Sequence, residues 1–379
     1  MVISLSVYKV VVLLSVMLVA MFSQVSAQAT QVCGSGGIQP RTADFQPGGI
    51  ILTMFDSTAI WVYDIERNRR YPLPDTRPCN SNCRLSPDAE WITYPNEGDF
   101  IKMRLDGTQR TPIVDNANDV EWWSADTLLV WTPDHRAYLQ PENDAATREY
   151  LDADGAISVQ PGGQWALTVE ADGDDFRRVL VNLQAREVQR VDLGVDVPYF
   201  NVSAWSPDGQ WLVYSAPGLY DSHVGIAGAE LYGVRPRDSA PTKLTDLNAL
   251  YGAVRINGHA LGQLSWSPDS TRIAFWVTEL LGADYLANTG NAVIHILDMD
   301  TGDITAYCGF STTEHTPNPP RLVWSPDGTH VAFGGNMPND SRGYLLLALD
   351  TATGTFTELS DGVFPSFGSP DIIAWGYAP

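Results

Sequence analysis

The sequence predicts an all-β protein, a seven-bladed β-propeller of four-stranded antiparallel blades closed by the C-terminal strand. One observation is a unit of strand, tight turn and strand that recurs along the chain. Its clearest copy is Ala204–Tyr214, which reads Ala-Trp-Ser-Pro-Asp-Gly-Gln-Trp-Leu-Val-Tyr. The other is a strand-like C-terminal segment that no further blade follows. Repeats of about 40 to 45 residues with four strands each are typical of propellers.

The turn of this unit has residues that favour a type I turn. Serine can bond the nearby backbone, proline sets φ at the second position, aspartate suits the third and glycine the fourth. Aromatic and β-branched flanks favour strands on both sides. We interpret the proline and aspartate of the four best copies as structural residues: Pro87, Asp88, Pro207, Asp208, Pro268, Asp269, Pro326 and Asp327.

Three weaker units complete the series, at Pro47, Ala125 and Pro161. The seven turn positions are then 47, 87, 125, 161, 207, 268 and 326. A second hairpin follows each turn, as in Asp99–Leu105 with Gln109–Ile113. Seven units of two hairpins predict seven blades, with no long helix after the N-terminal apolar run.

Ring closure is predicted by Asp371–Gly376, which resembles the strand that precedes the turn in other blades. We expect it to become the innermost strand of blade one, which would leave no sheet edge open there. The tryptophans before the other turns are expected to pack between blades: Trp123, Trp205, Trp266 and Trp324.

The domain organisation begins with a signal peptide at residues 1–27. Lys9 precedes the apolar run Val10–Phe22, and Val25 and Ala27 fit the small-residue rule for cleavage. An uncleaved anchor is the alternative, but the run is shorter than a membrane span. Residues 28–42 form an N-terminal segment and residues 43–379 a single propeller domain. We expect an exported protein, secreted or periplasmic, that spans no membrane after cleavage.

The charge argues against nucleic acid as a partner. The formal net charge is −22, and removing residues 1–27 takes away one positive charge (Lys9) and no negative one, giving −23. Such a chain repels phosphate backbones. We expect a monomer with a protein, peptide or glycan ligand and no cofactor.

Four cysteines follow the cleavage site, an even number that suits an oxidising compartment and allows three pairings. Cys79 and Cys83 lie four residues apart in a loop-like stretch and are the expected pair. Cys33 then pairs with Cys308 or stays free. A zinc site would need more ligands, and no histidine is near either cysteine of the short pair.

The Trp-Ser-Pro-Asp-Gly turns, followed by short apolar strands, resemble the WD-repeat-like blades of TolB-type propellers. The resemblance covers most of residues 43–376, although three of the seven turns lack the Ser-Pro-Asp core. It implies the propeller scaffold and leaves the partner open, because propellers with one scaffold bind different partners.

Long insertions gather on blades five to seven, where we place the binding site. In four-stranded blades the tight turns lie on one face, and the loops joining strands two and three, or one blade to the next, lie on the other. The insertions belong to the second class: 216–229, 246–262, 278–291, 309–320 and 360–370. Loops on a rigid scaffold commonly carry function. We predict Tyr220, Tyr251 and Tyr285 as ligand-binding anchors and His223, Arg255 and His259 as orienting groups.

Motifs for catalysis are missing from the sequence. It contains no Gly-x-Ser-x-Gly, His-Glu-x-x-His or phosphate-binding glycine loop. The expected function is therefore that of an exported, non-catalytic binding module with no catalytic residue and no metal. The alternative is a propeller-type hydrolase, directed at glycosides or peptides, that uses acidic residues in the loops of blades five to seven. Paired carboxylates leave no local motif, so the sequence keeps this alternative open.

Overall fold

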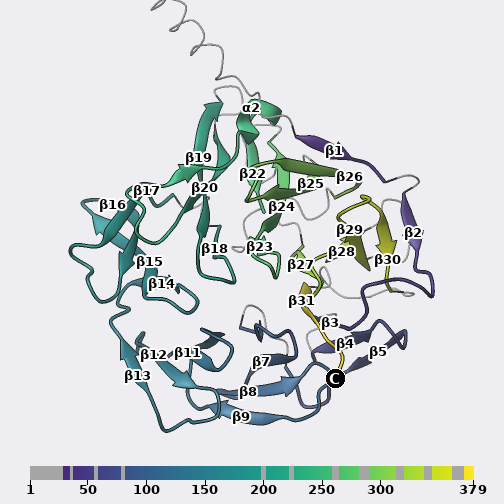
Figure 1. Ribbon diagram of the computed structural model, residues 1–379, viewed down its shortest axis with the longest axis horizontal. Helices are drawn as coiled ribbons and strands as arrows, with labels where there is room; N and C mark the ends of the chain where they lie inside the picture. The colour runs from purple at the N-terminus through teal and green to yellow at the C-terminus, as the bar shows by residue number, and fades with distance from the viewer. Residues whose placement is uncertain are drawn as a thin grey trace, which may run out of the picture.

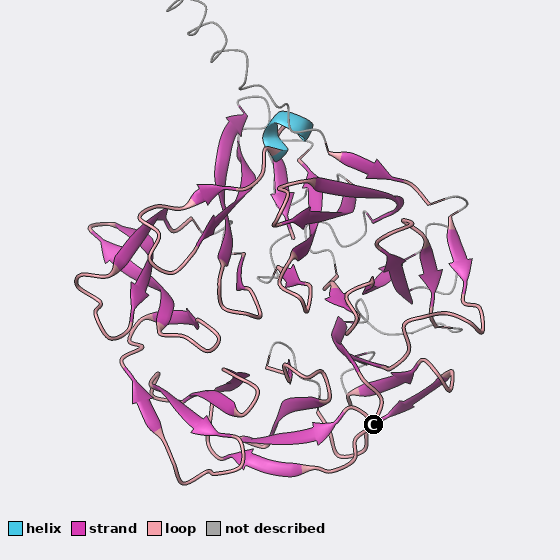
Figure 2. Cartoon of the chain, in the orientation of Figure 1, coloured by secondary structure: helices cyan, strands magenta, loops and turns pink. Residues whose placement is uncertain are grey.

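The computed structural model describes residues 29–34, 37–54, 59–77, 82–197, 202–221, 226–257, 264–280, 291–312, 320–336, 344–360 and 371–379. Within these residues the chain forms seven β-sheets arranged in a ring (Figure 1). Strands dominate the described residues, and the short helix α2 (Leu247–Tyr251) lies at the edge of the ring (Figure 2). The predicted seven-bladed propeller is confirmed.

The first four blades are four-stranded sheets. Blade one holds β31 (Asp371–Gly376), β3 (Ile50–Met54), β4 (Trp61–Asp64) and β5 (Arg69–Pro72). Blade two holds β6 (Arg84–Leu85), β7 (Trp91–Asn96), β8 (Asp99–Arg104) and β9 (Thr111–Val114). Blade three holds β10 (Asp119–Trp122), β11 (Thr127–Trp131), β12 (Ala137–Pro141) and β13 (Glu149–Leu151). Blade four holds β14 (Ala156–Val159), β15 (Trp165–Asp172), β16 (Asp175–Asn182) and β17 (Arg190–Val195).

Of the remaining three blades, blade five is also four-stranded, and blades six and seven have extra strands. Blade five holds β18 (Ser203–Trp205), β19 (Leu212–Asp221), β20 (Ile226–Val234) and β21 (Thr242–Lys243). Blade six holds β22 (Val254–Ile256), β23 (Ser265–Trp266), β24 (Arg272–Glu279), β25 (Ala292–Asp298), β26 (Ile304–Thr312) and β1 (Thr30–Val32). Blade seven holds β27 (Val323–Trp324), β28 (His330–Asn336), β29 (Tyr344–Asp350), β30 (Phe356–Glu358) and β2 (Ile38–Pro40).

The hydrophobic core lies between the blades. Buried side chains form seven clusters, and each cluster joins two neighbouring blades. The cluster between blades six and seven is rich in aromatic rings, with Trp276, Phe310, Phe333 and Phe356 in mutual contact. Because every sheet buries both of its faces in this way, each blade depends on its neighbours for stability.

The C-terminal strand closes the ring as predicted. β31 pairs antiparallel with β3, with Ile50 opposite Gly376 and Ile51 opposite Trp375. The Trp375 ring is fully buried, and its Nε1–H donates to the carbonyl of Gly48 at 3.0 Å. Strands from the two ends of the chain thus form one sheet, so unfolding of blade one must release both ends.

The four Ser-Pro-Asp turns share one set of hydrogen bonds. In the turn at Pro326, the Ser325 hydroxyl donates to Asp327 at 2.6 Å and accepts the backbone N–H of His330 at 2.9 Å. Asp327 also accepts the backbone N–H of Thr329 at 3.0 Å. The residue after the aspartate has a positive φ of 69° at Gly328, where glycine carries no steric cost. The turns at Pro87, Pro207 and Pro268 repeat these bonds.

The N-terminal segment, which the sequence left unassigned, adds parallel outer strands to two blades. β1 pairs with β26 of blade six, and β2 pairs with β30 of blade seven (Figure 1). A disulfide between Cys33 and Cys308 fixes the first of these strands. The sequence had left two alternatives for Cys33, and this pairing is one of them. Cys83 is also a disulfide cysteine. Its expected partner, Cys79, lies outside the described residues.

Several segments predicted as loops are regular structure instead. Residues 216–221 and 226–229 extend the β19–β20 hairpin, because their backbones continue the antiparallel pairing. The 246–262 insertion holds the short helix α2 (Leu247–Tyr251) and β22, which pairs with β24. No helix in the described part of the chain is both long and apolar enough to cross a membrane.

Candidate functional site

Two hollows lie on the face that carries the Ser-Pro-Asp turns, which we call the turn face. The first, the central hollow, has a volume of about 750 Å³ and is lined by six of the seven repeated turns. Three partly exposed indoles contribute to its wall, those of Trp122, Trp123 and Trp266, and the buried Trp324 and Trp375 border it. An aromatic wall of this kind favours a ligand with apolar surface.

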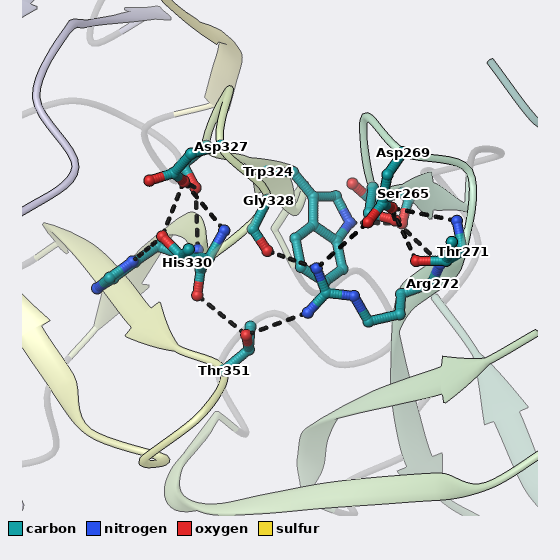
Figure 3. A network of polar contacts seen from close by, with 12 residues as sticks. Ser265, Asp269, Thr271, Arg272, Trp324, Asp327, Gly328, His330 and Thr351 are labelled. Atoms are coloured by element: carbon teal, nitrogen blue, oxygen red, sulfur yellow. Dashed lines mark hydrogen bonds and ion pairs between the residues drawn. The ribbon is translucent and has the colours of Figure 1, made fainter. Parts of the chain in front are cut away.

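Side chains from neighbouring blades brace this wall. Arg272 of blade six donates to the carbonyl of Gly328 in blade seven at 2.7 Å, and its guanidinium lies over the Trp324 ring, 4.8 Å from the centroid. In the reverse direction, the Trp324 Nε1–H donates to the carbonyl of Ser265 in blade six at 2.8 Å. Figure 3 shows these contacts beside the two Ser-Pro-Asp turns that they join. As predicted, Trp324 packs between blades.

The second hollow, the turn-face groove, follows the turns of blade four between the flank of blade three and the turns of blade five. Its volume is about 1180 Å³. Trp123 and Gly162 line both hollows, so the groove begins at the rim of the central hollow. Its lining combines aromatic rings with an unusual number of side-chain amides: Gln160, Gln164, Asn182, Gln184 and Gln210.

Two of these amides maintain the shape of the groove. Gln160 occupies the position that serine has in the Ser-Pro-Asp turns, and its Oε1 accepts the backbone N–H of Trp165 at 3.2 Å. Its Nε2 donates to the carbonyl of Gly209 in blade five at 2.8 Å. Asn182 accepts the backbone N–H of Gln184 at 2.9 Å. The floor is therefore held by bonds that cross from one blade to the next.

The other three amides are free for a ligand. Gln164, Gln184 and Gln210 are exposed, and their side chains make no hydrogen bond with any residue that the structure describes. They come from three different turns, two in blade four and one in blade five. Each offers a donor and an acceptor to the groove.

An exposed aromatic ring lies on the blade-three flank of the groove. Tyr150 is 53% exposed. Tyr138 packs against it, with ring centroids 5.4 Å apart, and the Arg136 guanidinium lies 5.2 Å from its centroid. A ring held by two neighbours loses little freedom when a ligand covers it.

Charges around the groove largely compensate one another. On the blade-five side Arg235 pairs with Asp238 at 3.4 Å and stacks on Trp211 at 4.9 Å. On the blade-three side Asp152 lies 3.9 Å from Arg186. The groove therefore does not carry the strong negative charge of the whole chain.

The residues predicted as a binding site on the opposite face are only partly described. His223, His259 and Tyr285 lie outside the described residues, and of Tyr220 only the backbone, in β19, is described. Tyr251 ends α2, while Arg255 lies in β22. The structure therefore does not show whether the six residues come together.

Tyr251 is engaged in packing. Its hydroxyl lies 3.0 Å from Nε2 of His295, and the two rings meet edge to face. Burial raises the pKa of the Tyr251 hydroxyl. Burial also lowers the pKa of His295 to about 4, so this histidine stays neutral, with Nδ1 donating to the carbonyl of Val293. The pair stabilises blade six, and Tyr251 has little surface left for a ligand.

Arg255 and a neighbouring carboxylate are buried. Arg255 is only 6% exposed. Glu230, in β20 directly after the 216–229 insertion, is 1% exposed and accepts the backbone N–H groups of Leu247 and Asn248 at 2.8 and 3.0 Å. It therefore caps the start of α2 from a neighbouring strand. This carboxylate is therefore used within the fold, and it shares the Lys243 ammonium with Asp246.

A different pair of acids lies on β10, beside the central hollow. Desolvation raises the pKa of both Asp119 and Glu121, against the lowering influence of Arg84, which lines the hollow and pairs with Asp119 at 2.8 Å. Glu121 accepts the Trp131 Nε1–H at 2.9 Å. Both acids thus have protein partners. Among the described residues no three His, Cys, Asp or Glu side chains are grouped so that they could hold a metal.

The sequence reasoning missed both hollows because it assigned function to loop length. The central hollow is built from the turns interpreted as structural, and the groove from the weak turn at Pro161 and its neighbours. The available signal was the presence of glutamines within or next to turns, at positions 164, 184 and 210.

Comparisons with known proteins give distant structural likenesses. No family model and no curated protein matches the sequence. Among solved structures, a protein from Agrobacterium tumefaciens assigned as TolB is 17% identical, with a TM-score of 0.40, covering 74% of this chain and 96% of its own. A protein from Bacteroides uniformis assigned as a 6-phosphogluconolactonase is 12% identical, with a TM-score of 0.43, covering 82% and 95%. A chain of the mitotic checkpoint complex is 12% identical, with a TM-score of 0.44, covering 88% and 91%. Likenesses this distant concern the fold alone.

Proposed function

We propose that this seven-bladed propeller is an exported, non-catalytic binding module that holds its ligand on the turn face. The observation that carries the proposal is the pair of connected hollows, lined by aromatic rings and free amides on a frame of inter-blade hydrogen bonds. Rigid concave sites with convergent polar groups are the usual form of ligand sites. The exposed disulfide between Cys33 and Cys308 agrees with an oxidising compartment.

The turn face is preferred to the predicted opposite face because of what each face offers. On the opposite face the two predicted residues whose side chains are described, Tyr251 and Arg255, are engaged in packing or buried. On the turn face Tyr150, Gln164 and Gln210 are exposed. A ring already held in place binds at low entropic cost, and an unpaired amide can bind without breaking a bond within the protein.

The test compares binding with turnover. Purified mature protein is probed with peptide and glycan arrays and, separately, with chromogenic glycosides and peptide esters. Saturable binding that Tyr150→Ala weakens, without product formation, is the expected result. Turnover abolished by Asp119→Asn or Glu121→Gln would establish the hydrolase in its place, and binding unaffected by Tyr150→Ala would reject the turn-face groove.

A further inference from the structure

We infer that the turn-face groove binds a neutral oligosaccharide, an inference that rests on the proposed binding function and names its ligand class. The three free amides, Gln164, Gln184 and Gln210, are the starting point. Neighbouring side chains of the same type are engaged, since Gln160 and Asn182 hold the floor. The groove therefore has amides in two roles, one structural and one available to a ligand.

The hydrogen-bonding chemistry of free amides matches hydroxyl groups. A carboxylate only accepts and a guanidinium only donates, whereas an amide does both from adjacent atoms. A sugar hydroxyl also does both, and two vicinal hydroxyls can face the carbonyl oxygen and the NH₂ group of one glutamine. A surface with three such amides suits a ligand with many hydroxyls and no charge.

The aromatic rings of the groove match the apolar face of a sugar. A pyranose ring presents an apolar face of C–H groups, which packs well on an aromatic ring. Tyr150 offers such a ring on one flank, held in place by Tyr138, and Trp123 lies half-buried at the inner end. Aromatic residues of this kind commonly supply most of the binding energy.

The size and charge of the groove further limit the class of ligand that it can bind. Sites for drug-sized molecules occupy roughly 300–1,000 Å³, and the groove, at about 1180 Å³, is longer than one sugar requires. The net charge of −22 opposes polyanionic glycans. Asp238 pairs with Arg235, and the lining also holds the exposed acid Glu149 and the exposed base Arg237, so the net local attraction for a cationic ligand is small. A neutral chain of several sugars fits these conditions.

The backbone of the floor argues against an extended peptide. Peptides commonly bind by adding a strand to an open sheet edge. Here the Leu183 N–H donates to the carbonyl of Gln164, and the Gly162 N–H to the carbonyl of Trp123, both at 2.7 Å. These backbone groups bond from one turn to another, so recognition depends on side chains.

The experiment screens mature protein on an array of neutral glycans and measures the best binder by calorimetry. We expect saturable binding that changes little between low and high salt, because no charge is recognised. Gln164→Ala, Gln184→Ala and Gln210→Ala should each weaken binding about fivefold, the equivalent of one neutral hydrogen bond. Tyr150→Ala should weaken it about tenfold or more. Gln31→Ala, at an exposed position on β1, is the matched control and should change nothing.

A peptide array is run in parallel so that two failures can be told apart. Peptide binding lost in the same glutamine variants would overturn the oligosaccharide and leave the binding function intact. If no neutral glycan binds, or glycan binding survives all three glutamine changes, the inference fails. Melting temperatures equal to that of the parent protein would show that each variant remains folded.

Discussion

The Ser325 hydroxyl donates a 2.6 Å hydrogen bond to Oδ1 of Asp327 while it accepts the backbone N–H of His330 at 2.9 Å. This pair of side chains closes a turn that would otherwise leave two backbone donors unsatisfied. The same pairing in three other blades explains why the chain repeats Ser-Pro-Asp and why these turns can form a rigid face.

Replacing Asp327 by alanine should therefore lower the free energy of unfolding by about 2 kcal/mol, since several hydrogen bonds are lost at once. The aspartate accepts from the Ser325 hydroxyl and from both the backbone and hydroxyl of Thr329. Burial alone would raise the pKa of Asp327, but these bonds hold it below the ordinary value. This stabilisation is present above the unfolded-state pKa and is lost as pH falls through the folded-state pKa.

Urea titration at neutral and acidic pH measures that change. Asp300→Ala is the control, because Asp300 is exposed and its side chain accepts no hydrogen bond from the described residues. Equal stability losses in the two variants would contradict the role given to the turn.

Ala89 is a position where a substitution should stabilise the protein. It occupies the fourth turn position of blade two with a φ of 58°, where Gly209 and Gly328 stand in blades five and seven. A residue with a Cβ is strained at this φ by roughly 1–2 kcal/mol. Ala89→Gly should raise the melting temperature, with a gain of up to about 1 kcal/mol after the extra flexibility of the unfolded chain is subtracted.

The control for Ala89 is Ala125→Gly, an exposed turn position that has no positive φ. There glycine relieves no strain and should destabilise slightly. Thermal unfolding of the two variants side by side would decide the matter. A fall in melting temperature for both would refute the strain at Ala89.

The sequence could predict the blades because their signals are local. Proline, aspartate and glycine at fixed turn positions, with strands on both sides, act over about ten residues, and Asp371–Gly376 carries the same pattern. The outer strands β1 and β2 carried no such signal, because their partners in blades six and seven are more than 250 residues away in the chain.

The candidate site could not be predicted because it depends on neighbouring blades. Gln160 and Gln164 belong to the same turn, yet only the structure shows that the first is bound to Gly209 and the second is free. Nor does the sequence show that the Glu230 carboxylate of β20 caps α2 in the following insertion.

The buried histidine of blade six predicts a loss of stability in mild acid. The ordinary histidine pKa is 6.5, and burial lowers that of His295 to about 4. Between these values the unfolded chain binds a proton that the folded chain does not, so stability present above pH 6.5 falls as the pH drops toward 4. The difference corresponds to about 3 kcal/mol.

Urea unfolding of wild type and His295→Gln at several pH values isolates this contribution. The variant is expected to be less stable at pH 7, because the packing against Tyr251 is altered, but to lose less stability on acidification. Parallel pH curves for the two proteins would show that His295 does not cause the acid sensitivity.

The disulfide between Cys33 and Cys308 should stabilise the ring by holding β1 against blade six. The two residues are 275 positions apart, and their Cα atoms lie 5.1 Å apart. A crosslink over so long a span restricts the unfolded chain strongly, so Cys33→Ser with Cys308→Ser should lower the free energy of unfolding by about 2–4 kcal/mol. Guanidinium unfolding under oxidising conditions gives the difference, and the double variant should show faster amide exchange at Gln31 and Val32, whose strand pairs with β26 alone among the described strands. If exchange in β1 matches that of the parent protein while stability falls, the bond acts through the unfolded chain alone and β1 is held by its own strand pairing.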